Sequence, residues 1–194
     1  MKHTLTKLAT ITLIATGTLA LSHCASGPVT KMNAASVNPR QLAADSRAAL
    51  NHLYSGNPVA RRLGTSAKGI LVFPNITKGG FVVGGMGGNG ALIRNDGTIR
   101  DFYETGGVSY GLQAGVQKYG YALFLMDDSA FNNVNRANGW EVGSSPSLVI
   151  VDEGMAGSLT TTTLNKSTYA FFFNQRGLMG GLSLQGSKIT RIRP

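Results

Sequence analysis

The feature that most constrains the fold is a hairpin signal near the middle of the chain. Two strand-forming runs, residues 91–94 and residues 98–103, are separated by Asn95, Asp96 and Gly97. A short Asn-Asp-Gly connection between two such runs is typical of an antiparallel hairpin. The 26 glycines of the chain suit tight turns and closely packed strands better than long surface helices. The sequence therefore predicts a sheet that includes this hairpin.

Helix signals lie on both sides of the hairpin. Asn38 and Asn57 each precede a proline, so a capping side chain comes directly before a residue whose backbone is preset for a helix. In the second half, an Asp-Asp-Ser run provides a cap and places negative charge at a helix start. We therefore expect helices over residues 39–55, 58–63 and 128 to about 138.

The remaining apolar runs predict strands and complete an α+β fold. The first strand is expected over residues 70–73 and is closed by Pro74. Further strands are expected over residues 81–83, 107–117, 119–126, 148–151, 158–163, 169–173, 178–184 and 188–192. The expected fold has helices at the front, one mid-chain helix, and a mostly antiparallel, strongly curved sheet or partial barrel.

The first 23 residues are predicted to be an export signal. Lys2 and Lys7 come before an uncharged apolar run over residues 8–21, which is shorter than the roughly 20 residues that a membrane-spanning helix needs. Residues 21–24 resemble the lipobox of bacterial lipoproteins, in which the cysteine, here Cys24, is acylated and becomes the new N-terminus. An ordinary signal with an incidental cysteine is the alternative. By the same resemblance, Ala25 favours the outer membrane over the inner one.

These signals divide the chain into three parts. Residues 1–23 are the predicted lipoprotein signal, and residues 24–38 are small and polar enough to serve as a flexible tether. Residues 39–194 are expected to form one domain, which is large enough for a hydrophobic core. Cys24 is the only cysteine, so the domain has no disulfide of its own.

The predicted domain is basic. The chain has a net charge of +9, and loss of Lys2 and Lys7 with the signal lowers this to +7. Such a balance favours anionic lipid, nucleic acid or acidic polymers as partners, and export argues against nucleic acid. Candidate lipid-binding residues form two groups along the chain: Arg61, Arg62, Lys68 and Lys78, and then Lys188, Arg191 and Arg193. An ordinary solvated surface would show the same pattern of basic residues.

Two glycine motifs match patterns of enzymes or nucleotide-binding proteins by letter only. Residues 85–90 read GxGxxG, but they lead into the predicted hairpin and not into a helix that could hold a pyrophosphate. Residues 107–111 read GxSxG, but that motif needs a later histidine, and His52 is the only histidine after Cys24. No residues have metal-ligand spacing. We therefore expect no catalytic residues, no cofactor and no metal.

Four segments together are typical of one known domain: residues 67–74, 78–90, 106–115 and 169–186. They resemble the SYLF domain, the lipid-binding domain of the Ysc84 and SH3YL1 group, and the resemblance spans about residues 40–192. It implies the fold of that family, an affinity for anionic membrane lipid and no enzymatic activity. Eukaryotic members bind phosphoinositides and, in yeast, actin. Actin is not expected as a partner of an exported protein.

The sequence thus predicts a lipid-anchored protein of the bacterial envelope whose domain binds anionic phospholipid head groups. The alternative is a non-enzymatic interaction or structural module that binds an envelope or host protein or a wall polymer. A third possibility is an enzyme that uses a carboxylate as its base in a cleft.

Overall fold

The computed structural model describes residues 37–81, 83–110, 115–136, 138–142, 148–151, 166–177, 184 and 186–194. This part of the chain contains three helices, which are α2 (Pro39–Gly56), α3 (Pro58–Ser66) and α4 (Asp128–Asn133). It also contains eight strands: β1 (Gly69–Phe81), β2 (Val83–Arg94), β3 (Ile99–Tyr110), β4 (Gly115–Leu125), β5 (Trp140–Glu141), β6 (Leu148–Val151), β7 (Thr168–Gly177) and β8 (Ser187–Ile192). The predicted signal lies outside the described residues, and so does all of the predicted tether except residues 37 and 38.

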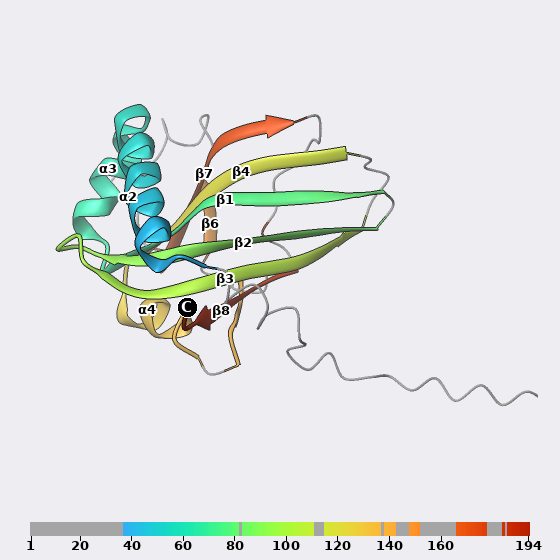
Figure 1. Ribbon diagram of the computed structural model, residues 1–194. Helices are drawn as coiled ribbons and strands as arrows, with labels where there is room; N and C mark the ends of the chain where they lie inside the picture. The colour runs from blue at the N-terminus through green and yellow to red at the C-terminus, as the bar shows by residue number, and fades with distance from the viewer. Residues whose placement is uncertain are drawn as a thin grey trace, which may run out of the picture.

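The strands form one curved sheet, and the α+β prediction is confirmed. Their order is β5-β8-β3-β2-β1-β4-β7-β6. The described pairs are antiparallel, apart from β6 with β7. Figure 1 shows α2 and α3 packed at one end of the long strands β1 to β4, whose other ends extend away from the helices. We call these other ends the far end of the sheet.

The first two helices begin where the local sequence signals place them. The Asn38 side chain accepts hydrogen bonds from the backbone N–H groups of Arg40 and Gln41, at 3.1 and 3.2 Å. Asn57 accepts one from Ala60 at 2.9 Å. These bonds satisfy donors that lack a partner in the first turn of a helix. No described helix is long and apolar enough to cross a membrane.

The third helix is shorter than predicted. It ends at Asn133 and not near Asn138. Past its end, the backbone N–H of Asn135 bonds to the carbonyl of Asn132, and its side-chain amide donates to the carbonyl of Phe131 at 2.9 Å. The asparagine side chain thus takes up a carbonyl that would otherwise lack a partner, which is a common way for such residues to end a helix.

Pro74 does not close the first strand, contrary to the prediction. β1 continues to Phe81, and the pairing with β4 shifts register between Phe73 and Ile76. Proline is tolerated at such a bulge because the ladder is already interrupted there, so its missing N–H removes no regular bond. The strand therefore passes through the proline.

The glycine-rich runs also belong to strands. The predicted strand over residues 81–83 is wrong, because Val83 begins β2, which continues through the glycines to Arg94. The predicted strand over residues 107–117 is wrong as well, since β3 ends at Tyr110 and β4 begins at Gly115. The predicted strands over residues 158–163 and 178–184 lie outside the described residues, except for Leu184.

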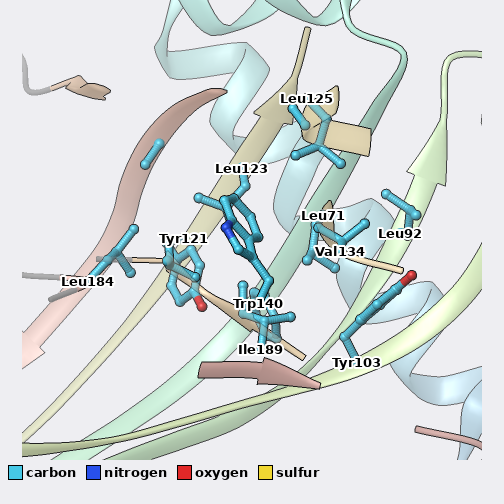
Figure 2. Packing of buried hydrophobic residues seen from close by; sticks show 14 of the residues in the cluster. Leu71, Leu92, Tyr103, Tyr121, Leu123, Leu125, Val134, Trp140, Leu184 and Ile189 are labelled. Carbon is cyan, nitrogen blue, oxygen red and sulfur yellow. The ribbon is translucent and has the colours of Figure 1, made fainter. Parts of the chain in front are cut away.

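The sheet has a core on each face. On the outer face, α2 and α3 cover the first cluster, which includes Leu53, Leu63, Val72 and Phe124. On the inner face, the second cluster includes Trp140 with Leu71, Leu123 and Ile189. Figure 2 shows the Trp140 ring among the inner-face side chains of Tyr121, Leu123 and Ile189. Both cores are built from residues between Ala49 and Ile189.

Candidate functional site

The first two predicted lipid-binding residues lie on α3 and are exposed. The Arg61 guanidinium donates two hydrogen bonds to the backbone carbonyl of Tyr54, at 2.7 and 3.2 Å. This contact ties α3 to the end of α2. Arg62 also has an interaction partner. Arg61 thus has a structural contact in addition to its exposed charge.

Lys68 and Lys78 lie in different surroundings. The Lys68 ammonium forms an ion pair with Asp128 at the start of α4, with an N···O distance of 2.8 Å. Lys78 is only 8% exposed, and it lies on the inner face beside Met86 and Gln117 in the register of the strands. It also has an interaction partner. Lys78 therefore does not belong to the exposed surface of the sheet.

The three basic residues near the C-terminus also lie in different places. Lys188 is on the outer face and Arg191 on the inner face of β8, because their positions differ by an odd number along the strand. Arg193 is exposed beyond the end of β8. Lys188 and Arg191, which belong to the same predicted group, therefore lie on opposite faces of the sheet.

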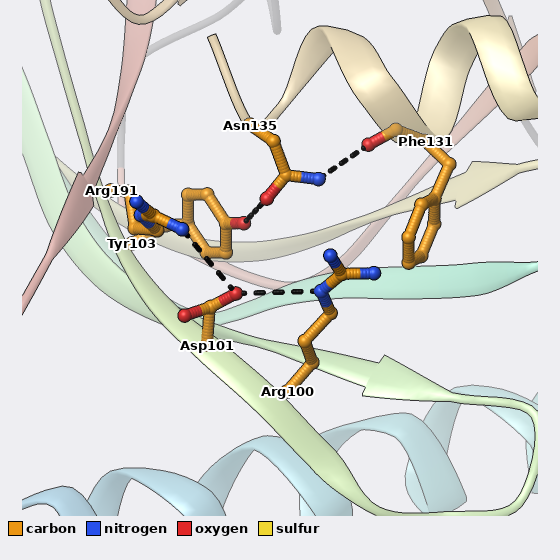
Figure 3. Close-up of polar contacts among 6 residues, drawn as sticks. All are labelled: Arg100, Asp101, Tyr103, Phe131, Asn135 and Arg191. Atoms are coloured by element: carbon orange, nitrogen blue, oxygen red, sulfur yellow. Dashed lines mark hydrogen bonds and ion pairs between the residues drawn. The ribbon is translucent and has the colours of Figure 1, made fainter. Parts of the chain in front are cut away.

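Arg191 belongs to a polar network beneath α4, which Figure 3 shows. Its guanidinium lies 3.9 Å from the Asp101 carboxylate, and the Arg100 guanidinium lies 3.5 Å from the same group. Tyr103 donates a hydrogen bond to the Asn135 side chain at 3.0 Å, and burial raises the pKa of Tyr103 to about 12. These contacts join α4 to β3 and β8, which indicates a structural role for Arg191.

The outer face instead carries three cations in one row of register partners, which runs from β7 to β8. Lys118 of β4 lies directly opposite Arg176 of β7, and both side chains are exposed. The row continues across the other strands in register as Thr77, Gly87, Gly106 and Lys188. We call Lys118, Arg176 and Lys188 the cation row.

The positive charge is strongest at the β4–β7 side of this row. The register partners of Lys118 are Thr77 and Arg176, and neither is acidic. At the other side, Glu141 lies opposite Lys188, and it has an interaction partner of its own. Like charges directly opposite each other on antiparallel strands are destabilising. The Lys118–Arg176 pair is therefore unfavourable for folding alone.

The next row toward the far end is apolar and exposed. It reads Val116, Gly79, Gly85 and Val108 across β4, β1, β2 and β3. Val108 is 58% exposed and Val116 is 60% exposed. We call Val108 and Val116 the valine pair. The far end of the outer face thus presents two apolar side chains in front of the cation row.

Glycines on the two faces have different environments. On the inner face, a β-carbon at Gly88 would clash with the backbone oxygen of Asn75, and one at Gly90 would lie 2.6 Å from the Phe73 ring. On the outer face, a β-carbon at Gly85 or Gly87 would find its nearest described neighbour at 3.8 or 3.5 Å, which is ordinary contact. Packing of the described residues therefore requires glycine at positions 88 and 90 but not at positions 85 and 87.

Other polar features offer less chemistry. Thr105, Gln117 and Tyr121 each have a buried side-chain oxygen without a described hydrogen-bond partner, and burial raises the pKa of Tyr121 far above its usual value. A hollow of about 440 Å³ at the β5–β8 edge is lined by Arg136, Trp140, Glu141 and Lys188 among others. Within the described ranges, no cluster of His, Cys, Asp and Glu could hold a metal ion.

Reasoning from sequence missed Lys118 and Arg176 because they are 58 positions apart in the chain. The signal that could have revealed their contact is the pairing register of β4 with β7. The GxGxxG segment lies inside β2, so no helix follows it, and residues 107–110 of the GxSxG match end β3. His52 is an exposed residue of α2.

Comparison with known protein families gives a match over the second half of the chain. Residues 106–193 match the model of the Ysc84 family, which is described as a Las17-binding protein and actin regulator. The matched segment includes the cation row and the valine pair. No curated protein matches the chain.

Proposed function

We propose that the chain carries a SYLF domain of the Ysc84 family, whose model matches residues 106–193, and that this domain binds anionic phospholipid head groups at a membrane surface. The observation that supports this proposal is the exposed cation row, in which Lys118 and Arg176 face each other at a cost to folding. A phosphate layer would neutralise both charges at once. The proposal places the contact on the outer face of the sheet and not on the C-terminal network around Asp101.

The charge of the row matches what weak membrane attachment needs. Each basic residue near an anionic membrane is worth about 1 kcal/mol, so Lys118 and Arg176 together supply about 2 kcal/mol, and Lys188, which has Glu141 opposite it, supplies less. One acyl chain alone gives only marginal anchoring, and a basic surface is a common second signal.

We further propose that Cys24 carries the acyl chain and that the protein sits in the bacterial envelope, with the outer membrane favoured. The tether of about 14 residues between Cys24 and α2 would span about 20 Å as a flexible chain. The domain would then work at a high local concentration of lipid, where a weak affinity is sufficient.

Vesicle binding of a charge-reversal variant tests the role of the row. We expect residues 25–194, which retain every described element and both cores, to sediment with vesicles of phosphatidylcholine and phosphatidylglycerol but not with phosphatidylcholine alone. Lys118→Glu should weaken this binding about 30-fold at low salt, because it changes the charge by two units. It should not lower stability, since the new carboxylate faces Arg176.

Arg94→Glu is the matched control. Arg94 is exposed on the same sheet, but it is the last residue of β2 and lies at the end of the strand opposite to the far end. The substitution changes the net charge by the same amount and should weaken binding much less. Equal losses for the two variants would show that net charge and not the row determines binding. Equal sedimentation with neutral and anionic vesicles would contradict the electrostatic proposal altogether.

The family description also names a protein partner. The alternative is an interaction module for an envelope protein or a wall polymer. It would be favoured if the domain does not bind vesicles but retains a stoichiometric partner in a pull-down from envelope extracts.

A further inference from the structure

The valine pair is an exposed apolar feature at one end of the outer face. Val116 is the second residue of β4, and Val108 lies two residues before the end of β3. Three strand spacings separate them across Gly79 and Gly85, which corresponds to about 14 Å. Among the described residues, Ile150 is the only other exposed large hydrophobic residue, and it is 38% exposed on β6. Two such side chains in one row form a localised apolar rim.

The spacing between the rim and the cation row fits the layers of a bilayer surface. Val116 is two residues from Lys118 along β4, which corresponds to about 7 Å. Apolar groups of interfacial proteins enter about 5–10 Å into the boundary between head groups and acyl chains. If the strands enter the membrane steeply, the valines reach this boundary while Lys118 and Arg176 remain at the phosphates.

The glycines between the valines allow a close approach. Neither Gly79 nor Gly85 has a side chain that would hold the sheet away from a surface, and packing does not require glycine at either position. Glycine commonly occurs where a backbone must approach a ligand closely. The floor between Val108 and Val116 is therefore open to lipid head groups.

We propose that the far end of the sheet inserts into the surface of an anionic phospholipid bilayer, with Val108 and Val116 below the head groups and the cation row at the phosphates. This inference rests on the proposed membrane function and adds an orientation to it. It also defines the ligand as a packed bilayer and not as a free head group, because a soluble phosphodiester offers no layer for the valines to enter.

Introduced tryptophans test the orientation in residues 25–194. Trp140 is the only native tryptophan, and it is 5% exposed, so its emission provides a constant background. With anionic vesicles, Val116→Trp should show a blue shift and quenching by lipids brominated on the acyl chains. Ile150→Trp, at an exposed apolar position outside the row, should show neither. Bound protein in which Val116→Trp is neither shifted nor quenched would overturn the orientation while leaving membrane binding intact.

A pair of nearly isosteric substitutions tests the energetic role of the rim. Val108→Thr and Val116→Thr keep a β-branched side chain and add a hydroxyl group that must be dehydrated on insertion. Each should weaken vesicle binding about tenfold, and the loss should persist at high salt. Glycerol phosphate in solution should not compete with vesicles.

The outcomes separate the two proposals. Unchanged binding of the double threonine variant, or competition by glycerol phosphate at concentrations that match the lipid phosphate, would refute insertion and leave a surface charge contact. Absence of any binding to anionic vesicles would refute both the orientation and the proposed function.

Discussion

Gly87 and Gly88 are neighbours on β2, and replacing each with alanine should change stability in opposite directions. Gly87 faces outward, where its β-carbon would lie 3.5 Å from the carbonyl oxygen of Thr105. Gly88 faces inward, where the β-carbon would lie 2.7 Å from Ile76 and closer still to the backbone oxygen of Asn75. The same methyl group is therefore tolerated on one face and excluded on the other.

The expected magnitudes follow from these environments. Gly87→Ala reduces the freedom of the unfolded chain without a clash, and such a change stabilises a protein by about 0.4–1 kcal/mol. Gly88→Ala forces the β1 bulge to move, because the carbonyl of Asn75 cannot rotate away as a flexible side chain could. Overpacking of this kind destabilises by about 1–3 kcal/mol. The two variants should differ by about 1.5–4 kcal/mol.

Urea unfolding of residues 25–194 measures this difference. Trp140 is buried in the inner core, so its fluorescence reports loss of that core on unfolding. The free energies of unfolding of the two variants are compared together with the slopes of their dependence on urea concentration. A changed slope would indicate a change in the unfolded state. Each kcal/mol also corresponds to about 2–4 °C in the melting temperature of a protein of this size.

A loss of stability for Gly87→Ala as large as that for Gly88→Ala would refute the reasoning. It would mean that β2 does not present Gly87 to solvent. The cation row and the valine pair would then lose their assignment to one exposed face, because the register through β2 joins them.

Three further changes have expected outcomes. Asp127 accepts a hydrogen bond from the backbone N–H of Ala130 at 2.8 Å, and this bond holds the pKa of Asp127 below its usual value. The stabilisation is thus present above the unfolded pKa of about 3.9 and is lost as the pH falls through the lower folded value. Asp127→Ala should lower the free energy of unfolding by about 0.5–2 kcal/mol at pH 7, and urea titrations should show that this difference disappears under acid conditions. Tyr103→Phe removes the hydrogen bond to Asn135 and should lower the urea midpoint by an amount equivalent to about 0.5–1.5 kcal/mol, and an unchanged midpoint would contradict a role of that bond in holding α4. Cys24→Ser should abolish incorporation of labelled palmitate in bacterial cells, whereas persistent labelling would exclude Cys24 as the acylated residue.

The parts of the fold that sequence predicts well are those with local causes. Asn38 and Asn57 cap helices through bonds to residues two or three positions away, so the signal and the structure coincide. The β2–β3 connection likewise follows from Asp96, which accepts bonds from the backbone and side chain of Thr98 at 2.8 and 2.6 Å. Such contacts need no knowledge of the rest of the chain.

The parts that sequence misses depend on partners that are distant in the chain. Pro74 and the glycines of β2 disfavour strands by local propensity. In the sheet, β1 lies between β2 and β4, so its pairing on both sides overrides that propensity. Lys118 and Arg176 approach each other only because β4 pairs with β7. No spacing rule within a single segment could reveal this contact.

The face on which Lys78 lies follows from the bulge in β1. Strand side chains alternate with a period of two, so a shift of one residue exchanges the two faces. Between Phe73 and Ile76 the pairing with β4 shifts, and after this point Thr77 lies outward opposite Lys118 while Lys78 lies inward opposite Gln117. In the sequence Lys78 and Lys118 are equivalent basic residues, but the bulge in β1 buries Lys78, whereas the regular alternation of β4 keeps Lys118 in the cation row. The same alternation divides the glycines, so that Gly88 and Gly90 make room for the inner core while Gly85 and Gly87 leave the outer surface flat. The bulge therefore removes Lys78 from the outer face, so the charge available for a membrane contact there comes from Lys118, Arg176 and Lys188.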